Sequence, residues 1–128
     1  MTVKTAFVSM VNSVAGSTGG LYPGLPPAEV ALPVKTYRLV SRVDQTDHSG
    51  EITYSVCRFQ LTIWGDNFAQ IDSIGRAMRT FLTGLRDTYG SDVIMTTLPA
   101  GEVDMIDPTT GLYKIIQDWF VMHTTGPV

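Results

Sequence analysis

The sequence predicts an α+β domain: an antiparallel or mixed sheet that contains a long β-hairpin and carries two helices packed on it. From Thr53 to Trp64, β-branched and aromatic side chains are dense, which is typical of a strand. Gly65 ends this pattern, and from Asn67 to Arg86 apolar residues recur at the helical period of about 3.6. With the flanking segments, the predicted order is α-β-β-α-β-β-β in one domain, residues 1–128.

The N-terminal part contains one helix and one long connection. Apolar residues at helical spacing predict a helix from Thr2 to Val14. From Ala15 to Pro33 the chain is rich in Gly and Pro, and because Pro fixes φ and lacks an N–H donor, we expect an extended connection. Loops of this length in a compact domain are often functional or lie on a partner.

The segment Val34 to Val43 predicts the first strand of a hairpin. Strand alternation places Tyr37, Leu39 and Val43 on one face, with arginines on the other. The polar stretch Asp44 to Gly50 then joins this strand to Thr53–Trp64. We therefore expect a long antiparallel hairpin whose tip, residues 44–50, projects into solvent or into a partner.

The C-terminal part predicts a capped helix and three strands. Asp66 or Asn67 offers a side-chain oxygen to the start of the helix. After that helix, the alternation and breaker residues predict a turn at Tyr89–Ser91, strands at Asp92–Leu98 and Glu102–Ile106 separated by Pro99–Gly101, a turn at Asp107–Gly111, and a last strand at Leu112–Thr124. Both faces of the last strand carry large apolar residues, so we expect it to be covered on both sides.

Composition excludes several classes of function. The net charge of −3 and the pI near 5.1 argue against a protein that binds nucleic acid through its phosphates, and against a basic membrane-surface protein. Charged residues make up 16%, against about 25% in typical soluble domains, which suggests that partner subunits cover part of the surface. A single cysteine, Cys57, allows no intramolecular disulfide, and we expect it to be buried. No apolar run is long enough to span a membrane, and the N-terminus is a poor signal peptide, so we expect a cytoplasmic chain.

No catalytic residue, cofactor site or metal site is predicted. Asp44, Asp47, His48 and Glu51 form the best metal candidate, but their spacing matches neither an EF-hand nor a zinc site, so a solvated hairpin tip is favoured. The chain has no G-x-S-x-G motif. His123 lacks a motif partner and is expected to be a strand-end surface residue or a partly buried ring.

Arginines follow one side of the long predicted helix. Asp72 precedes Arg76 by four residues, the favourable order for a helical ion pair. Arg76, Arg79 and Arg86 are expected on the solvent side of the helix. The alternative to a solvated face is contact with an acidic partner, either another subunit or DNA.

Several pieces resemble the tail-terminator, or tail-completion, proteins of long-tailed bacteriophages. The N-terminal helix is followed by Leu21-Tyr22-Pro23 and by Leu32-Pro33-Val34, and the central strand closes on Trp64-Gly65 before its helix. The last hairpin contains Asp107-Pro108-Thr109-Thr110-Gly111 and later Gln117-Asp118-Trp119-Phe120-Val121, and is the most specific piece. The resemblance extends over nearly the whole chain.

The resemblance implies a structural, non-enzymatic virion protein without cofactor. Family members form a ring, typically a hexamer, which caps the tail tube, stops its growth and joins it to the head connector, while DNA passes through without specific binding. This places the chain at the head-proximal end of the tail, assembled in the host cytoplasm. The regions expected to make contacts are the hairpin tip, the Gly16–Pro33 loop, the Asp107–Gly111 turn and the long helix, with the candidate residues Asp44, Asp47, His48, Tyr22, Leu25, Asp107, Thr109, Arg76 and Arg79. The alternatives are a head–tail joining or tail-tube protein, and a small dimeric α+β enzyme or ligand-binding protein.

Overall fold

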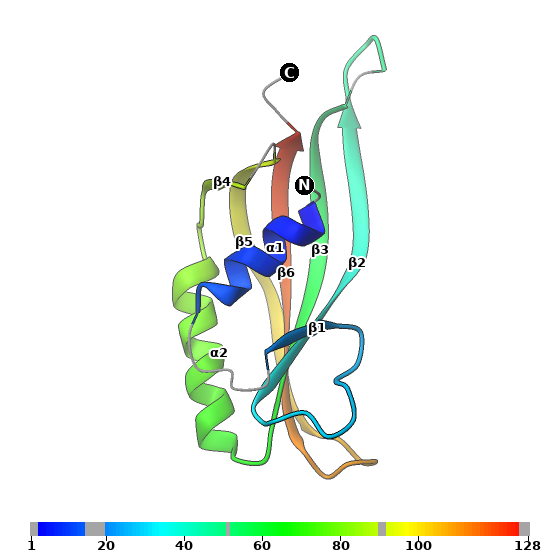
Figure 1. Ribbon diagram of the computed structural model, residues 1–128. Helices are drawn as coiled ribbons and strands as arrows, with labels where there is room; N and C mark the ends of the chain where they lie inside the picture. Colours follow the sequence, from blue (N-terminus) through cyan, green and yellow to red (C-terminus); the bar gives the residue numbers. More distant parts are fainter. Residues whose placement is uncertain (1–2, 15–19, 51, 90–91, 126–128) are drawn as a thin grey trace.

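A six-stranded mixed sheet carries two helices on one face (Figure 1). The computed structural model describes residues 3–14, 20–50, 52–89 and 92–125. The sheet order is β1-β2-β3-β6-β5-β4, and all neighbours are antiparallel except the parallel pair β1 and β2. The elements are α1 (Val3–Asn12), β1 (Leu21–Pro23), β2 (Val34–Thr46), β3 (Ile52–Gly65), α2 (Phe68–Leu82), β4 (Asp87–Tyr89), β5 (Asp92–Ile106) and β6 (Tyr113–Thr125). The predicted α+β class is confirmed.

The core lies between the sheet and the two helices. Four alternate residues of β3 face the helices and have no exposed surface: Cys57, Phe59, Leu61 and Ile63. The predicted burial of Cys57 is confirmed. Because alternate strand residues point to opposite faces, the intervening residues of β3 lie on the face away from the helices.

Helix α1 is held to the sheet by its own apolar stripe. Phe7 is completely buried and stacks on Phe59, with 4.2 Å between the ring centroids. A helix of 10 residues is marginal alone, so this packing stabilises it. Beyond its end, the ammonium of buried Lys35 donates to the carbonyl of Val14 at 3.5 Å, and burial lowers the pKa of Lys35.

Helix α2 follows β3 across a tight junction. Asn67 is the N-cap, and its side-chain oxygen accepts a hydrogen bond from the backbone N–H of Gln70 at 3.3 Å. A Cβ on Gly65 would lie 2.5 Å from Cγ2 of buried Ile71, so this position favours glycine. The helix ends at Leu82, earlier than the predicted Arg86, because Thr83 is already extended.

A β-bulge in β2 changes the predicted faces of the hairpin. The register with β3 shifts between Leu39 and Ser41, which leaves Val40 as the extra residue. Beyond the bulge, Arg42 lies opposite Cys57, on the helix-covered face, and Val43 lies opposite Val56 on the other. The prediction that Val43 shares a face with Leu39 is therefore wrong, because one inserted residue inverts the alternation.

The strands on either side also differ from the prediction. The two strands predicted between residues 92 and 106 are one strand, β5, and the predicted break at Pro99–Gly101 is a bulge. Two short strands were not predicted: β1, in the Gly- and Pro-rich connection, and β4, after α2. Each pairs over only three residues, too few to produce an alternation signal. Within the predicted turn at Tyr89–Ser91, residues 90 and 91 lie outside the described residues.

Candidate interaction surfaces

The sheet has one face that the helices do not cover, called here the bare face. Its exposed apolar side chains come mainly from three strands, and Phe120 of β6 is 38% exposed although it lies between the buried Trp119 and Val121. The prediction that the last strand is covered on both sides is therefore wrong within this chain, because both helices lie on the same face. The other exposed apolar residues of this face include Val43, Leu98, Val103 and Met105.

An ion pair crosses the centre of the bare face. Nη2 of Arg58 lies 2.8 Å from Oδ2 of Asp118, and the guanidinium lies 6.0 Å from the centroid of the Phe120 ring. Within the described residues, Nε of Arg58 and Oδ1 of Asp118 are buried without a hydrogen-bond partner. The face thus combines apolar surface with a charged pair, which suits contact with a protein partner.

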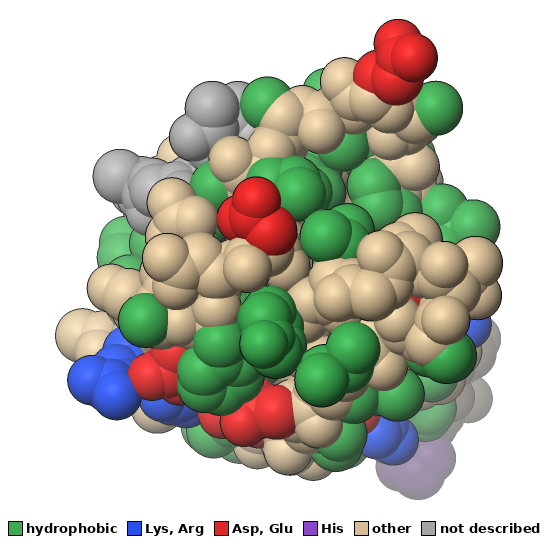
Figure 2. All heavy atoms as spheres, turned by 90° about the horizontal axis from the view of Figure 1, so that it is seen from below, with side chains coloured by type: hydrophobic (Ala, Val, Ile, Leu, Met, Phe, Trp, Pro, Cys, Tyr) green, Lys and Arg blue, Asp and Glu red, His purple; other side chains and the backbone are tan. Residues whose placement is uncertain are grey.

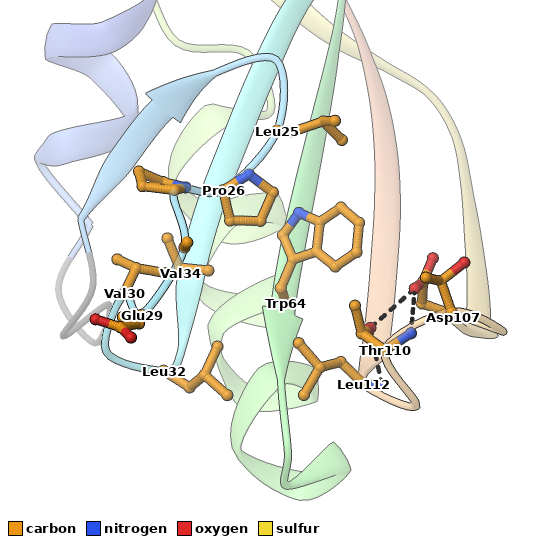
Figure 3. A pocket seen from close by; sticks show the side chains of 13 residues that line it. Leu25, Pro26, Glu29, Val30, Leu32, Val34, Trp64, Asp107, Thr110 and Leu112 are labelled. Atoms are coloured by element: carbon orange, nitrogen blue, oxygen red, sulfur yellow. Dashed lines mark hydrogen bonds between the residues drawn. The ribbon is translucent and has the colours of Figure 1, made fainter.

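A groove of about 530 Å³ lies at the end of the sheet opposite the hairpin tip (Figure 3). One wall is the loop of residues 25–32, and the other is formed by Trp64 and the β5–β6 turn. The indole N–H of Trp64 donates to Oγ1 of Thr36 at 3.0 Å, and the Lys114 ammonium lies 4.9 Å from the Trp64 ring centroid. These contacts fix the indole in place. The lining is mostly apolar and includes Leu25, Pro26, Val30, Leu32, Val34 and Leu112.

Three predicted contact residues meet at this groove. Leu25, Asp107 and Thr109 all line it, and Leu25 is 77% exposed. Asp107 accepts hydrogen bonds from the Thr110 N–H at 2.9 Å and the Thr110 hydroxyl at 2.8 Å, which lower the pKa of its carboxyl. Asp107 therefore shapes the turn. Tyr22 lies nearby in β1 and is partly buried. Figure 2 views the molecule from this end and shows hydrophobic side chains exposed among carboxylates.

The predicted residues of the hairpin lie far from the groove. Asp47 and His48 are exposed at the tip, where the carboxylate of Asp47 accepts from the N–H of Ser49 at 2.9 Å. Asp44 does not belong to the loop as predicted, because β2 continues to Thr46. Hydrogen bonds from Ser55 and Arg42 lower the pKa of Asp44, so this carboxylate is already paired within the chain. Glu51 lies outside the described residues, and the described part of the chain holds no group of three His, Cys, Asp or Glu side chains suited to a metal.

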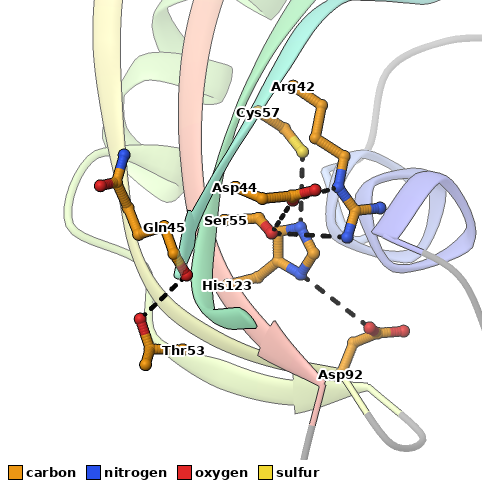
Figure 4. A network of polar contacts seen from close by, with 8 residues as sticks. All are labelled: Arg42, Asp44, Gln45, Thr53, Ser55, Cys57, Asp92 and His123. Carbon is orange, nitrogen blue, oxygen red and sulfur yellow. Dashed lines mark hydrogen bonds and ion pairs between the residues drawn. The ribbon is translucent and has the colours of Figure 1, made fainter. Parts of the chain in front are cut away.

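A buried polar network lies next to the hairpin tip, where β2 and β3 meet the end of β6 (Figure 4). Sγ of Cys57 is 3.4 Å from Nε2 of His123, and Nδ1 of His123 is 4.0 Å from Oδ1 of Asp92. His123 is only 2% exposed, so the prediction of a surface or partly buried ring is wrong. The sequence contains a signal for this burial, since alternation in β6 places His123 on the same face as Trp119 and Val121. The contact of His123 with Cys57, by contrast, depends on the register of β3 with β6.

The chemistry of this network does not favour a nucleophile. The Cys57 thiol has no exposed surface, and burial raises its pKa, so it remains protonated. Burial likewise lowers the pKa of His123, with the positive charge of Arg42 as a smaller cause, and keeps the imidazole neutral. A Cys–His–Asp arrangement without solvent access to sulfur is suited to packing rather than to covalent catalysis.

The arginines of α2 have separate roles. Arg76 pairs with Asp72 at 2.8 Å, and this predicted pair is confirmed. Arg79 forms an ion pair with Glu102 of β5, so it links the helix to the sheet rather than only facing solvent. Beside them, Nε2 of buried Gln117 donates to the carbonyl of Gly75 at 3.0 Å and to Glu102 at 2.8 Å. Gln117 and Arg79 therefore link α2 to β5 through Glu102.

Comparison with known proteins finds similarity in structure and not in sequence. No protein-family profile matches the sequence, and no curated protein shows a significant sequence match. A chain from a structure described as the virion of a native gene transfer agent particle has a similar fold, with a TM-score of 0.70. The match covers 88% of this chain and 83% of that chain at 14% sequence identity, so the likeness is one of fold. In the described residues, no helix is long and apolar enough to cross a membrane.

Proposed function

We propose that this chain is a structural, non-enzymatic component of a phage-like virion, and that it acts as a tail terminator. The observation that carries the proposal is the shared fold with a chain of a gene transfer agent virion, which extends over most of both chains. In this role a ring of identical subunits, six in the family that the sequence resembles, caps the tail tube, stops its growth and joins it to the head connector.

The surfaces of the chain fit a subunit of an assembly. The bare face and the groove expose apolar side chains that a partner would cover, in agreement with the low charged content of the sequence. The two ends of the sheet also differ: one carries the polar hairpin tip and the other the apolar groove. A ring of such subunits presents unlike surfaces above and below, as a terminator that binds tube on one side and head connector on the other requires.

The net charge of −3 suits a ring through which DNA passes without being held. Tight neutralisation of phosphates in the lumen would oppose ejection of the genome. We therefore expect no specific DNA binding, and a position in the virion at the head-proximal end of the tail after assembly in the host cytoplasm.

A tube-assembly experiment tests the proposal. Tail-tube subunits from the same particle are polymerised with increasing amounts of this protein, and tube length is measured by electron microscopy. We expect tubes to shorten as the protein is added, and rings of this protein to appear at tube ends. Leu25→Asp, which puts a charge into the groove, should weaken capping, whereas the matched control Gln70→Asp on exposed α2 should not.

The outcomes separate the terminator from its neighbours in the virion. A chain that forms long tubes alone is a tube protein, and one that leaves tube length unchanged while binding the head connector is a joining protein. A stable monomer that leaves tube length unchanged and binds neither tube nor connector would refute a role at this joint.

A further inference from the structure

We infer that neighbouring copies join by pairing the free edge of β2 in one copy with the free edge of β5 in the next. This inference rests on the proposed ring and names its subunit joint. On the β2 side, β1 pairs only with Lys35–Tyr37, and the N–H of Gly24 bonds to the carbonyl of Tyr37. Among the described residues, no strand pairs with that edge from Arg38 to Thr46.

The second free edge lies on the opposite side of the sheet and at the opposite end. Strand β4 pairs with Asp92–Ile94, and the N–H of Gly84 donates to the carbonyl of Thr97 at 2.7 Å. Beyond this point the outer edge of β5 has no neighbouring strand in the described part of the chain. Pro99 and the adjacent bulge interrupt the edge, so the segment suited to pairing is Glu102–Ile106.

The directions of the strands allow the sheet to continue from one copy to the next. Strands β2 and β6 run one way, and β3 and β5 run the other way, because each adjacent pair is antiparallel. A second copy placed beside the first in the same orientation therefore presents its β5 antiparallel to β2. A joint between two different edges of the same chain is heterologous, and repeating it by rotation closes a ring.

The side chains of the two edges are complementary on both faces. An antiparallel register that places Arg42 opposite Asp104 also places Val43 opposite Val103. Arg42 and Asp104 both lie on the helix-covered face, in register with Cys57 and Ile115. The two valines lie on the bare face and are 54% and 57% exposed. Opposite charges and apolar pairs directly across strands both stabilise a sheet.

The same register sets Asp44 opposite Glu102. Both carboxylates already have arginine partners within their own chain, Arg42 and Arg79. Charged side chains at sheet edges often prevent pairing between copies. Here the arginine lies on one free edge and Asp104 on the other, so these two charges attract when different edges meet. The Asp44–Glu102 pair opposes the joint, and the arginine that each carboxylate already binds reduces this repulsion.

The stagger of the free edges favours closure over a flat sheet. Strand pairing through β3 and β6 places Arg42 in line with Thr97 on β5 of the same chain. The residue that Arg42 would face across the joint is Asp104, which lies seven positions further along β5. Because Ala100 is a bulge residue, this separation is six steps of the ladder, and a shift of about 20 Å across four strands, roughly 19 Å wide, inclines the strands by about 46°. Closed barrels tilt their strands by about 35–45°, so this joint curves in the sense of a closed assembly.

Cysteine cross-linking tests the joint directly. Val43→Cys and Val103→Cys are made separately, and native Cys57 does not compete because it is fully buried. An oxidised equimolar mixture should give a cross-linked dimer, each variant alone should stay uncross-linked, and the double variant should give a ladder that ends at the ring number. As a control, Met95→Cys, which is also exposed but lies at the end of β5 that β4 covers, should not cross-link to Val43→Cys.

A charge exchange gives a second readout. Arg42→Glu or Asp104→Arg alone should weaken each joint by about three- to tenfold, because an attractive cross-strand pair becomes repulsive. Mixing the two variants should restore rings, measured by light scattering, since an alternating ring again pairs opposite charges. A folding defect cannot be rescued by a second chain, so rescue by mixing supports the joint.

The outcomes distinguish this inference from the proposed function. Rings that form without the Val43–Val103 cross-link and without rescue overturn the joint and leave the terminator proposal standing. A wild-type chain that stays monomeric at high concentration, with or without tube subunits, overturns both.

Discussion

Replacing Phe7 by Ala is expected to destabilise the chain and to release α1 from the sheet. Phe7 is completely buried, stacks on Phe59 at 4.2 Å and contacts Tyr37, with centroids 6.3 Å apart. Truncation of a buried Phe removes its transfer free energy and leaves a cavity, a combined cost of about 3–5 kcal/mol. Within this range, the lost ring contact with Phe59 contributes roughly 0.5–1.5 kcal/mol.

Urea unfolding followed by far-UV circular dichroism measures the change in free energy, and hydrogen exchange reports on α1 itself. We expect the amides of α1 to lose protection more than those of β3, because a helix of 10 residues depends on its packing. Phe7→Leu should cost less, about 1–2 kcal/mol, and Lys4→Ala on the exposed side of α1 should change little. A loss below about 1 kcal/mol, with α1 still protected, would refute the packing argument.

Three further predictions concern the helix cap and the buried network. Asn67→Ala should lower stability by about 1 kcal/mol, because the first turn of α2 loses its acceptor, and thermal unfolding should show that Asn67→Asp is nearly neutral. Because burial lowers the pKa of His123 in the folded chain, the unfolded chain takes up this proton at a higher pH than the folded chain does. Stability should therefore be full above about pH 6.5 and fall as the pH drops below that value, a slope that denaturant titrations should find absent in His123→Gln. The Cys57 thiol should react with a thiol reagent only at the rate of unfolding, and immediate reaction in native buffer would contradict its burial.

The sequence predicts the α+β class and the central strand–helix unit well, because both rest on local periodicity. The four alternating residues of β3 and the Asn67 cap are visible in the order of residues alone. The bulges at Val40 and Ala100 are not, because an inserted residue leaves composition unchanged while it inverts the faces that follow.

The contact surfaces could be predicted only in part. Leu25, Asp107 and Thr109 were identified as loop and turn residues, but their meeting at one groove depends on how the loop folds back over Trp64. The β6 part of the bare face was predicted as covered, because apolar residues on both sides of β6 indicate burial without saying whether the cover belongs to the same chain. The Cys57–His123 contact joins residues 66 positions apart, and only the β3–β6 register brings them together.

The strand order has a consequence for how the newly made chain folds. The four long strands of the sheet form two hairpins, β2–β3 and β5–β6, and these pair with each other only where β3 meets β6. At a synthesis rate of about 5–20 residues per second, roughly 48 residues separate the completion of β3 from the start of β6, a delay of some 2–10 seconds. During that interval one long side of β3 has no strand to pair with, while its Phe59 and Leu61 await the rest of the core. Production of the soluble protein should therefore respond to temperature and to chaperones that shield nascent β-strands, even though the finished sheet protects this strand on both sides.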